Sequence, residues 1–282
     1  MARKETERLT ATLEKQPYPT LGQPYENSLA MKFVPVAGTE VLFGVWDVRV
    51  RDFEAFVQAT GHEATTGMYS LRSDGWKQRG DKWKSPGFTQ GPTHPVCGVS
   101  WDDAKAFCEW LTKQERVAGK LSASQSYRLP MDWEWSVAVG LSESRDGTPK
   151  DKDMKIKDVY PWGTKWPPPP GARNYAGSEA ADGNWPSDWK PIEGYRDGHP
   201  RTSPVGSFKA NRFGLYDMGG NVWQWCEDWY DSEQKSRGLR GASWYDFVPE
   251  CLLSSSRYYG PPDFRFDGFG FRCVLVVGGS AR

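Results

Sequence analysis

The sequence is poor in the residues that build most metal and redox centres. It has three histidines, His62, His94 and His199, which lie far apart and form no metal-ligand spacing. Its five cysteines are an odd number, and residues 1–16 are charged and lack the apolar core of a secretory signal. We therefore expect no signal peptide, no full disulfide framework, and a location that is cytoplasmic or left open by the sequence.

Net charge and long apolar runs are absent as well. The 36 Lys and Arg residues balance 36 Asp and Glu residues, so the formal net charge at pH 7 is +0. Nonspecific nucleic-acid binding needs a basic field, so we expect no nucleic-acid partner. No stretch of about 18 apolar residues occurs, which excludes a transmembrane helix. We interpret residues 1–20 as a charged N-terminal segment or linker.

Glycine, proline and tryptophan are abundant instead. The chain of 282 residues has 30 Gly and 21 Pro, well above the roughly 12% that these two types reach in average proteins. It also has 15 Trp, which indicates a core of large flat side chains rather than long aliphatic helices. We predict one α+β domain over residues 21–282, irregular, with few short helices and strands.

Capping residues and apolar spacing mark the helices. Gly61 is a plausible left-handed stop for a helix over residues 51–61. Ser100 and Asp103 form an approximate capping box at the start of a longer helix. Its buried stripe is predicted to be Ala104, Phe107, Cys108 and Leu111.

The remaining segments read as short elements and loops. Loosely alternating apolar residues over 31–50 predict one or two strands, and a short helix is expected over 131–139. Residues 62–95 and 144–170 are predicted to be loops, since they are polar or charged and rich in turn formers.

Seven segments, in order along the chain, resemble the formylglycine-generating enzyme (sulfatase-modifying factor) superfamily. Together they span about residues 28–277. They are MKFVPV at 31–36, PVCGVSWDDA at 95–104, YRLP with DWEW within 127–135, SPVGSF at 203–208, NRFGLYDMGGNVWQW at 211–225, LRGASW at 239–244 and GFRC at 270–273. The resemblance implies a C-type-lectin-like fold, which has little regular secondary structure.

The catalytic chemistry of that family does not transfer to this sequence. The resemblance implies two redox-active cysteines that bind copper(I), in the stretch that here runs from Ser243 to Arg257. This stretch holds one cysteine, Cys251. Counting back from Arg257, the two catalytic positions are occupied by Trp244 and Pro249. Linear copper(I) coordination needs two thiolates, so we expect no copper and no oxidase activity.

Two structural features of the family map onto this chain by resemblance. A disulfide is implied between Cys108 and Cys273, with two buried free thiols as the alternative. Structural calcium is implied at two loop sites, with turn capping as the alternative role of the same polar groups. The first calcium set is Asn174, Tyr175, Asp197 and His199, and the second is Asp217, Gly220, Val222 and Gln224.

The C-terminal stretch has the composition of a binding face. Nine of the 28 residues from Trp244 to Phe271 are Trp, Tyr or Phe, and most others are Ser, Gly, Asp or Pro. Rigid aromatic anchors with small polar neighbours are typical of paratopes. We expect some of these aromatic residues, such as Trp244 and Phe271, to belong to the core. The rest would expose a large apolar patch unless a ligand covers it.

Thirteen positions in this stretch share a coding property. Each residue can be reached from an AAC codon by changes at its adenines alone. This resembles the variable region, here about 244–271, of a diversity-generating retroelement protein. The positions, which we predict to bind the ligand, are Tyr245, Asp246, Phe247, Val248, Cys251, Ser256, Tyr258, Tyr259, Gly260, Phe264, Phe266, Gly268 and Phe269.

The sequence leaves three candidate functions open. The first, which we favour, is a noncatalytic protein that presents a diversified, aromatic-rich face to a protein, peptide or glycan ligand. The second is a fixed sensor or scaffold domain associated with a bacterial kinase. The third is a copper-dependent formylglycine-generating oxidase. Gene context distinguishes the first two, and copper titration tests the third.

Overall fold

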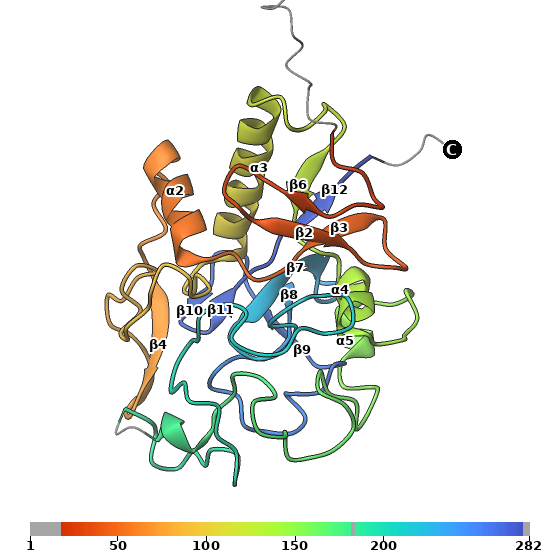
Figure 1. The fold of residues 1–282 in the computed structure, drawn as a ribbon. Helices are drawn as coiled ribbons and strands as arrows, with labels where there is room; N and C mark the ends of the chain where they lie inside the picture. The colour runs from red at the N-terminus through yellow and green to blue at the C-terminus, as the bar shows by residue number, and fades with distance from the viewer. Residues whose placement is uncertain (1–17, 182–183, 279–282) are drawn as a thin grey trace, which may run out of the picture.

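The computed structural model describes residues 18–181 and 184–278. Most of the predicted N-terminal segment 1–20 lies outside these residues. Helices α2 and α3 and the largest sheet occupy one half of the molecule, and long loops fill the other (Figure 1). This is an irregular α+β fold, as the glycine and proline content predicts.

The two main helices begin and end close to where their sequence signals lie. Helix α3 covers Trp101–Val117, and its N-cap Ser100 accepts a hydrogen bond from the Asp103 backbone while Asp103 accepts one from the Ser100 backbone. Helix α2 covers Val50–Thr60 and ends at Gly61, whose φ is 69°. The predicted stripe of α3 is buried: Ala104, Phe107, Cys108 and Leu111.

The largest sheet joins both ends of the chain. Its strand order is β1 (Tyr25–Glu26), β2 (Lys32–Pro35), β3 (Val41–Gly44), β12 (Val274–Val276) and β6 (Ser126–Arg128). The last strand, β12, lies between β3 and β6 and pairs antiparallel with both. These pairings fix the C-terminal strand to the rest of the fold.

Two smaller sheets carry the residues of the site described below. One has the order β11 (Phe269–Gly270), β7 (Trp223–Trp229), β8 (Arg237–Arg240) and β9 (Arg257–Gly260). The other has the order β10 (Arg265–Phe266), β4 (Met68–Arg72) and β5 (Gly75–Gln78). Strands β10 and β11 follow one another in the chain and join different sheets, so they bring the two sheets together.

The β4–β5 hairpin is a correction to the predicted loop over 62–95. Its turn places Arg72 opposite Gly75, and Gly75 has a φ of 83°. Tyr69, Leu71 and Trp76 around Asp74-Gly75 are a hairpin signal that the polar composition of the segment obscured. The predicted loop over 144–170 likewise contains one helical turn, α5 (Pro149–Lys152), which Thr148 caps.

The remaining helices are short, and the core around them is aromatic. Helix α4 covers Asp132–Val139, and a 3-10 turn covers Ser178–Ala180. Trp135, Trp225 and Trp244 are among the largest fully buried side chains. Cys108 and Cys273 are brought together with their Sγ atoms 3.5 Å apart, and both are buried free thiols.

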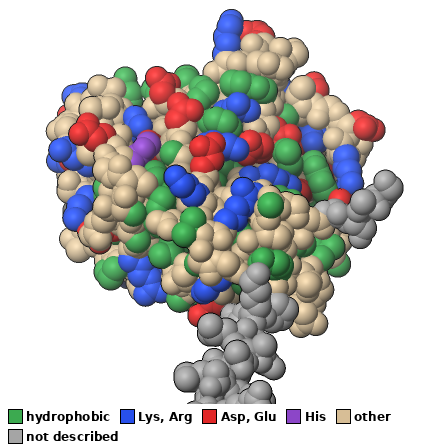
Figure 2. Space-filling view, turned by 90° about the horizontal axis from the view of Figure 1, so that it is seen from above, with side chains coloured by type: hydrophobic (Ala, Val, Ile, Leu, Met, Phe, Trp, Pro, Cys, Tyr) green, Lys and Arg blue, Asp and Glu red, His purple; other side chains and the backbone are tan. Residues whose placement is uncertain are grey.

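Among the described residues, no helix combines the length and the apolar character needed to cross a bilayer. The face seen in Figure 2 carries acidic and basic side chains intermixed, in keeping with the net charge of zero.

A buried ion network centred on Asp132 fastens α4 to the strands on either side of the residue 241–256 segment. The Asp132 carboxylate accepts from Arg240 at 2.7 Å and from Arg257 at 3.0 Å, and Lys152 lies 2.9 Å away. Asp132, Arg240 and Arg257 are buried. The guanidinium groups hold the pKa of Asp132 far below its usual range against the opposing effect of burial.

Removing the Asp132 carboxylate should be costly, because in the described part of the chain it leaves Arg240 buried without a carboxylate partner and Arg257 with Glu143 as its one remaining carboxylate. We expect Asp132→Ala to lower the free energy of unfolding by about 3–5 kcal/mol in denaturant titrations. The control is Glu54→Ala, which breaks the exposed pair with Lys84 and should change stability little. Equal effects of the two variants would contradict the role given to Asp132.

Candidate ligand-binding site

A cavity of about 460 Å³ lies between the two smaller sheets and the C-terminal loop. We call it the aromatic pocket. Nine of its lining side chains are aromatic, and the other three are Asp246, Val248 and Cys251. The lining residues are Tyr69, Trp76, Trp189, Trp223, Tyr245, Asp246, Phe247, Val248, Cys251, Tyr258, Phe266 and Phe269.

Strand pairing positions the rings from the two sheets. Phe269 on β11 pairs in parallel register with Trp223 on β7, and Phe266 on β10 pairs with Tyr69 on β4. The Phe266 and Phe269 rings are 4.9 Å apart, so the two sheets meet at the pocket. Tyr258 projects from β9 and lies 5.6 Å from the Trp223 ring.

The third wall is the loop over residues 245–251. The Asp246 carboxylate accepts hydrogen bonds from the backbone nitrogen and the hydroxyl of Ser243, at 2.7 and 2.8 Å. These bonds form a local turn that directs Tyr245 toward Trp76, with their rings 5.0 Å apart. Phe247 closes the loop against Trp189 at 5.6 Å.

Eight of the thirteen predicted binding positions therefore line one pocket, and five do not. Tyr259 is exposed and stacks on Tyr230 at 4.3 Å, and Phe264 packs against Phe266 at 4.8 Å. Ser256, Gly260 and Gly268 are buried, so the expectation that all thirteen share an exposed face does not hold. Their burial has a physical reason: Gly260 packs against the Trp225 ring, any side chain at Gly268 would collide with the Tyr245 ring, and Ser256 lies in the segment held by Arg240.

Four lining residues come from outside the C-terminal stretch and were not predicted. They are Tyr69, Trp76, Trp189 and Trp223. The hairpin signal around Asp74-Gly75 could have placed Tyr69 and Trp76 on strands. Trp223 is buried in the core and also borders the pocket. Nothing in the sequence around Trp189 indicates its position, because a long loop carries it there.

The single thiol of the pocket is poorly suited to redox chemistry. Burial, followed by the charges of Asp246 and Glu250, raises the pKa of Cys251 to about 12. The thiol is therefore protonated at neutral pH, whereas nucleophiles and copper(I) ligands are thiolates. Trp244 and Pro249, the positions identified by counting back from Arg257, do not line the pocket.

Comparison with known proteins assigns this architecture. Residues 39–277 match the family described as the sulfatase-modifying factor enzyme 1-like domain. The chain belongs to this family. A formylglycine-generating enzyme of Streptomyces coelicolor is 28% identical, over 82% of this chain and 77% of its own length. The inactive C-alpha-formylglycine-generating enzyme 2 of Bos taurus is 32% identical, over 70% of this chain and 56% of that protein.

Solved structures give the same fold. PvdO from Pseudomonas aeruginosa has a TM-score of 0.59 at 20% identity, over 91% of this chain and 99% of that one. Treponema denticola variable protein 1 has a TM-score of 0.50 at 19% identity, over 89% of this chain and 98% of that one. The sulfatase-modifying factor family thus includes proteins named as active and as inactive enzymes, on a fold shared with a variable protein.

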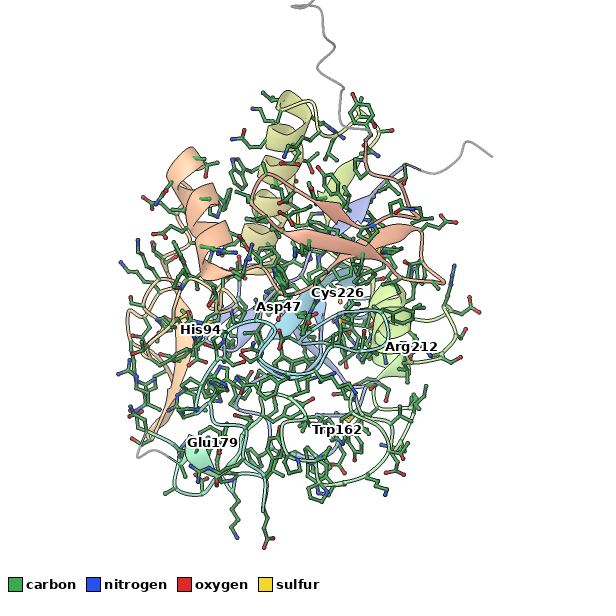
Figure 3. The ribbon with its side chains drawn as sticks, in the orientation of Figure 1. Asp47, His94, Trp162, Glu179, Arg212 and Cys226 are labelled. Atoms are coloured by element: carbon green, nitrogen blue, oxygen red, sulfur yellow. The ribbon has the colours of Figure 1, made fainter. Side chains whose placement is uncertain are left out.

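The first calcium set implied by this family fits a hard cation. Asp197 accepts from the backbone nitrogens of Tyr175 and His199, both at 2.8 Å, so these residues converge. The Asn174 Oδ1 atom is buried with no hydrogen-bond partner, as is one oxygen of Glu179, which was not predicted (Figure 3). Burial and the adjacent Glu179 raise the pKa of Asp197 to about 8. A calcium ion would satisfy these oxygens and relieve that repulsion.

The second calcium set already has a positive charge beside it. The Gln224 Oε1 atom accepts from Trp135 at 2.9 Å and from the buried Arg272 at 3.2 Å. Arg272 also supplies positive charge beside Asp217, whose Oδ1 atom is buried with no hydrogen-bond partner. The backbone of Gly220 and Val222, the other members of the set, lies in the same region. Across residues 18–181 and 184–278, no group of three or more His, Cys, Asp or Glu side chains is placed to hold a metal ion, so a site built on fewer carboxylates would need amide or carbonyl oxygens as further ligands.

The ionised Asp246 carboxylate should lower the stability of the folded protein at neutral pH. Burial raises its pKa from 3.8 to about 6, so folding favours the protonated form and stability falls as pH rises through this interval. Asparagine keeps an oxygen for the Ser243 bonds and carries no charge. We expect Asp246→Asn to raise the melting temperature at pH 7.5 by about 2–4 °C.

The pH dependence distinguishes this from a general effect of removing an acid. The gain from Asp246→Asn should shrink toward pH 4, where the native carboxyl is also neutral. Asp263→Asn, at an exposed position, should leave the melting temperature unchanged at both pH values. A gain at pH 4 equal to that at pH 7.5 would refute the electrostatic explanation.

Proposed function

We propose that this protein is a noncatalytic ligand-binding member of the sulfatase-modifying factor family. Its binding site is the aromatic pocket, whose C-terminal positions are diversified to suit a protein, peptide or glycan ligand. The observation that carries the proposal is the convergence of eight coding-related positions, separated by up to 24 residues, on a single cavity. Rings held by two sheets give the rigid contact area that paratopes use.

The division between frame and face supports diversification. Tyr69, Trp76 and Trp223 lie on paired strands of the frame. Val248 and Tyr258, among the predicted variable positions, are exposed at the rim, so their replacement would not disturb the core. Exposed positions on a rigid frame tolerate such changes.

A second candidate is a fixed sensor domain of a kinase. The serine/threonine-protein kinase pkn1 of Chlamydia caviae is 28% identical over 68% of this chain, which corresponds to 25% of that protein. Sequencing the locus decides between the two. We expect an adjacent reverse transcriptase gene and a near-copy of the segment encoding residues 244–271 that differs at adenines. A locus with neither would contradict diversification and favour the sensor.

Binding through the pocket is tested by matched tyrosine variants on glycan and peptide arrays. Tyr258 lines the pocket and its neighbour Tyr259 does not, although 45% and 51% of their surfaces are exposed. We expect array signals to fall at least about tenfold in Tyr258→Ser, because an aromatic anchor is lost, and to persist in Tyr259→Ser. Equal loss in both variants would move the site away from the pocket.

The oxidase alternative is tested with the same protein. With copper(I) and oxygen, we expect no conversion of a cysteine in a sulfatase-type peptide, because Cys251 is the single thiol of the pocket. Mass spectrometry of the peptide gives the result. Turnover that disappears in Cys251→Ser would overturn the noncatalytic assignment.

We also propose that the first calcium set holds a structural calcium ion, ligated by Asn174, Asp197 and Glu179 side chains with the carbonyl groups of Tyr175 and His199. Millimolar calcium should raise the melting temperature, since the ion binds the folded state. Asp197→Asn should abolish this calcium response. Asp217→Asn, in the second set, should retain it, whatever its own melting temperature. A native protein that does not respond would exclude the site.

A further inference from the structure

The aromatic pocket holds a carboxylate with no cation beside it. Asp246 is the one acidic residue among those that line the cavity, and the lining includes no lysine or arginine. Its hydrogen bonds come from Ser243 and the Trp223 side chain, all uncharged donors. Asp246 is partly buried and has no charged partner among the described residues, so a cation in the cavity would pair with it.

The neighbouring titratable groups do not alter this charge. They are Tyr175, Tyr245, Cys251 and Tyr258, and burial raises the pKa of each. All four are uncharged at neutral pH. Asp246 is therefore the one lining residue that is negative when ionised, and Glu250, whose charge also acts on Cys251, is exposed and outside the lining.

The rings that line the pocket with Asp246 are inclined to one another at large angles. Trp76 stands nearly perpendicular to Tyr245 and to Phe266, at 77° and 74°, with centroids 5.0 Å apart in both pairs. Phe247 is inclined by 51° to Trp189 across the loop. Walls at such angles present ring faces to a guest from several directions, and ring faces attract cations.

We propose that the aromatic pocket selects an organic cation of the alkylated ammonium class, with Asp246 as its counter-ion. This inference rests on the proposed function, which assigns the pocket to ligand binding, and adds the chemical class of the part of the ligand that enters it.

The lining favours this class over the alternatives. A sugar needs several polar groups to satisfy its hydroxyls, and the pocket offers one carboxylate among nine rings. A neutral apolar guest would cover Asp246 and leave its charge desolvated and unpaired. A primary ammonium is strongly hydrated, whereas a methylated ammonium loses less hydration and contacts ring faces directly.

An isosteric pair of probes tests the charge preference. The cation is 4-hydroxyphenyltrimethylammonium, and 4-tert-butylphenol replaces its nitrogen by carbon with nearly the same shape. In calorimetric titrations at pH 7.5, we expect the cation to bind the native protein at least about tenfold more tightly. Asp246→Asn should remove this preference, because the affinity for the cation falls and the affinity for 4-tert-butylphenol is unchanged. Glu250→Gln, an exposed neighbour outside the lining, should keep it.

Ring faces and pH provide independent readouts. Tyr258→Phe should retain the cation preference, and Tyr258→Leu should reduce it, because leucine has no π-face. Preference should also decline as pH falls below about 6, where Asp246 takes up a proton.

The outcomes separate the two proposals. Equal affinity for the two probes in the native protein overturns the cation inference and leaves the pocket as a binding site for apolar ligands. Failure of both probes to bind overturns the inference, and the proposed function then also fails if Tyr258→Ser leaves the array signals unchanged. Retention of the preference in Asp246→Asn overturns the role of the carboxylate.

Discussion

The Asp132 carboxylate is the point on which the binding site depends. It pairs with Arg240 at the end of β8 and Arg257 at the start of β9, and so holds both ends of the segment that carries the pocket loop. Arg240 also donates to the carbonyl groups of Ser254 and Ser256. With its ends fixed in the interior, the intervening loop can vary without unfolding the sheet, which is how a rigid frame tolerates a changeable face.

Another buried arginine, Arg272, fixes the C-terminal segment to the frame. It donates to the carbonyl groups of Gly44 and Tyr216, at 2.7 and 2.6 Å, and lies 3.4 Å from Asp47, at the centre of the molecule (Figure 3). The Gly-Phe-Arg-Cys block thereby connects β3 and a distant loop to β12. Asp132 and Asp47 have arginine partners in the interior. Asp246, at the pocket, accepts its hydrogen bonds from uncharged groups.

The chemistry of the pocket is consistent with the proposed function. Cys251 is placed within the cavity, but it is a single protonated thiol surrounded by rings. The lining therefore lacks the second sulfur that copper(I) chemistry requires and has the apolar area that ligand binding requires.

The sequence by itself determined the helix caps at Ser100 and Gly61, the stripe of α3, the family and the stretch from which most of the pocket comes, because these depend on local spacing and on ordered motifs. Only the tertiary structure decided which positions face the cavity. Gly268 and Gly260 share the coding property of Tyr258, yet packing against Tyr245 and Trp225 buries them. Trp76 and Trp189 join the pocket through a sheet and a loop, from segments more than fifty residues before the C-terminal stretch that begins at Trp244. It also decided that Arg272 occupies the surroundings of Asp217 and Gln224, where the motif alone implied calcium, because charge pairing in the interior depends on contacts between distant residues.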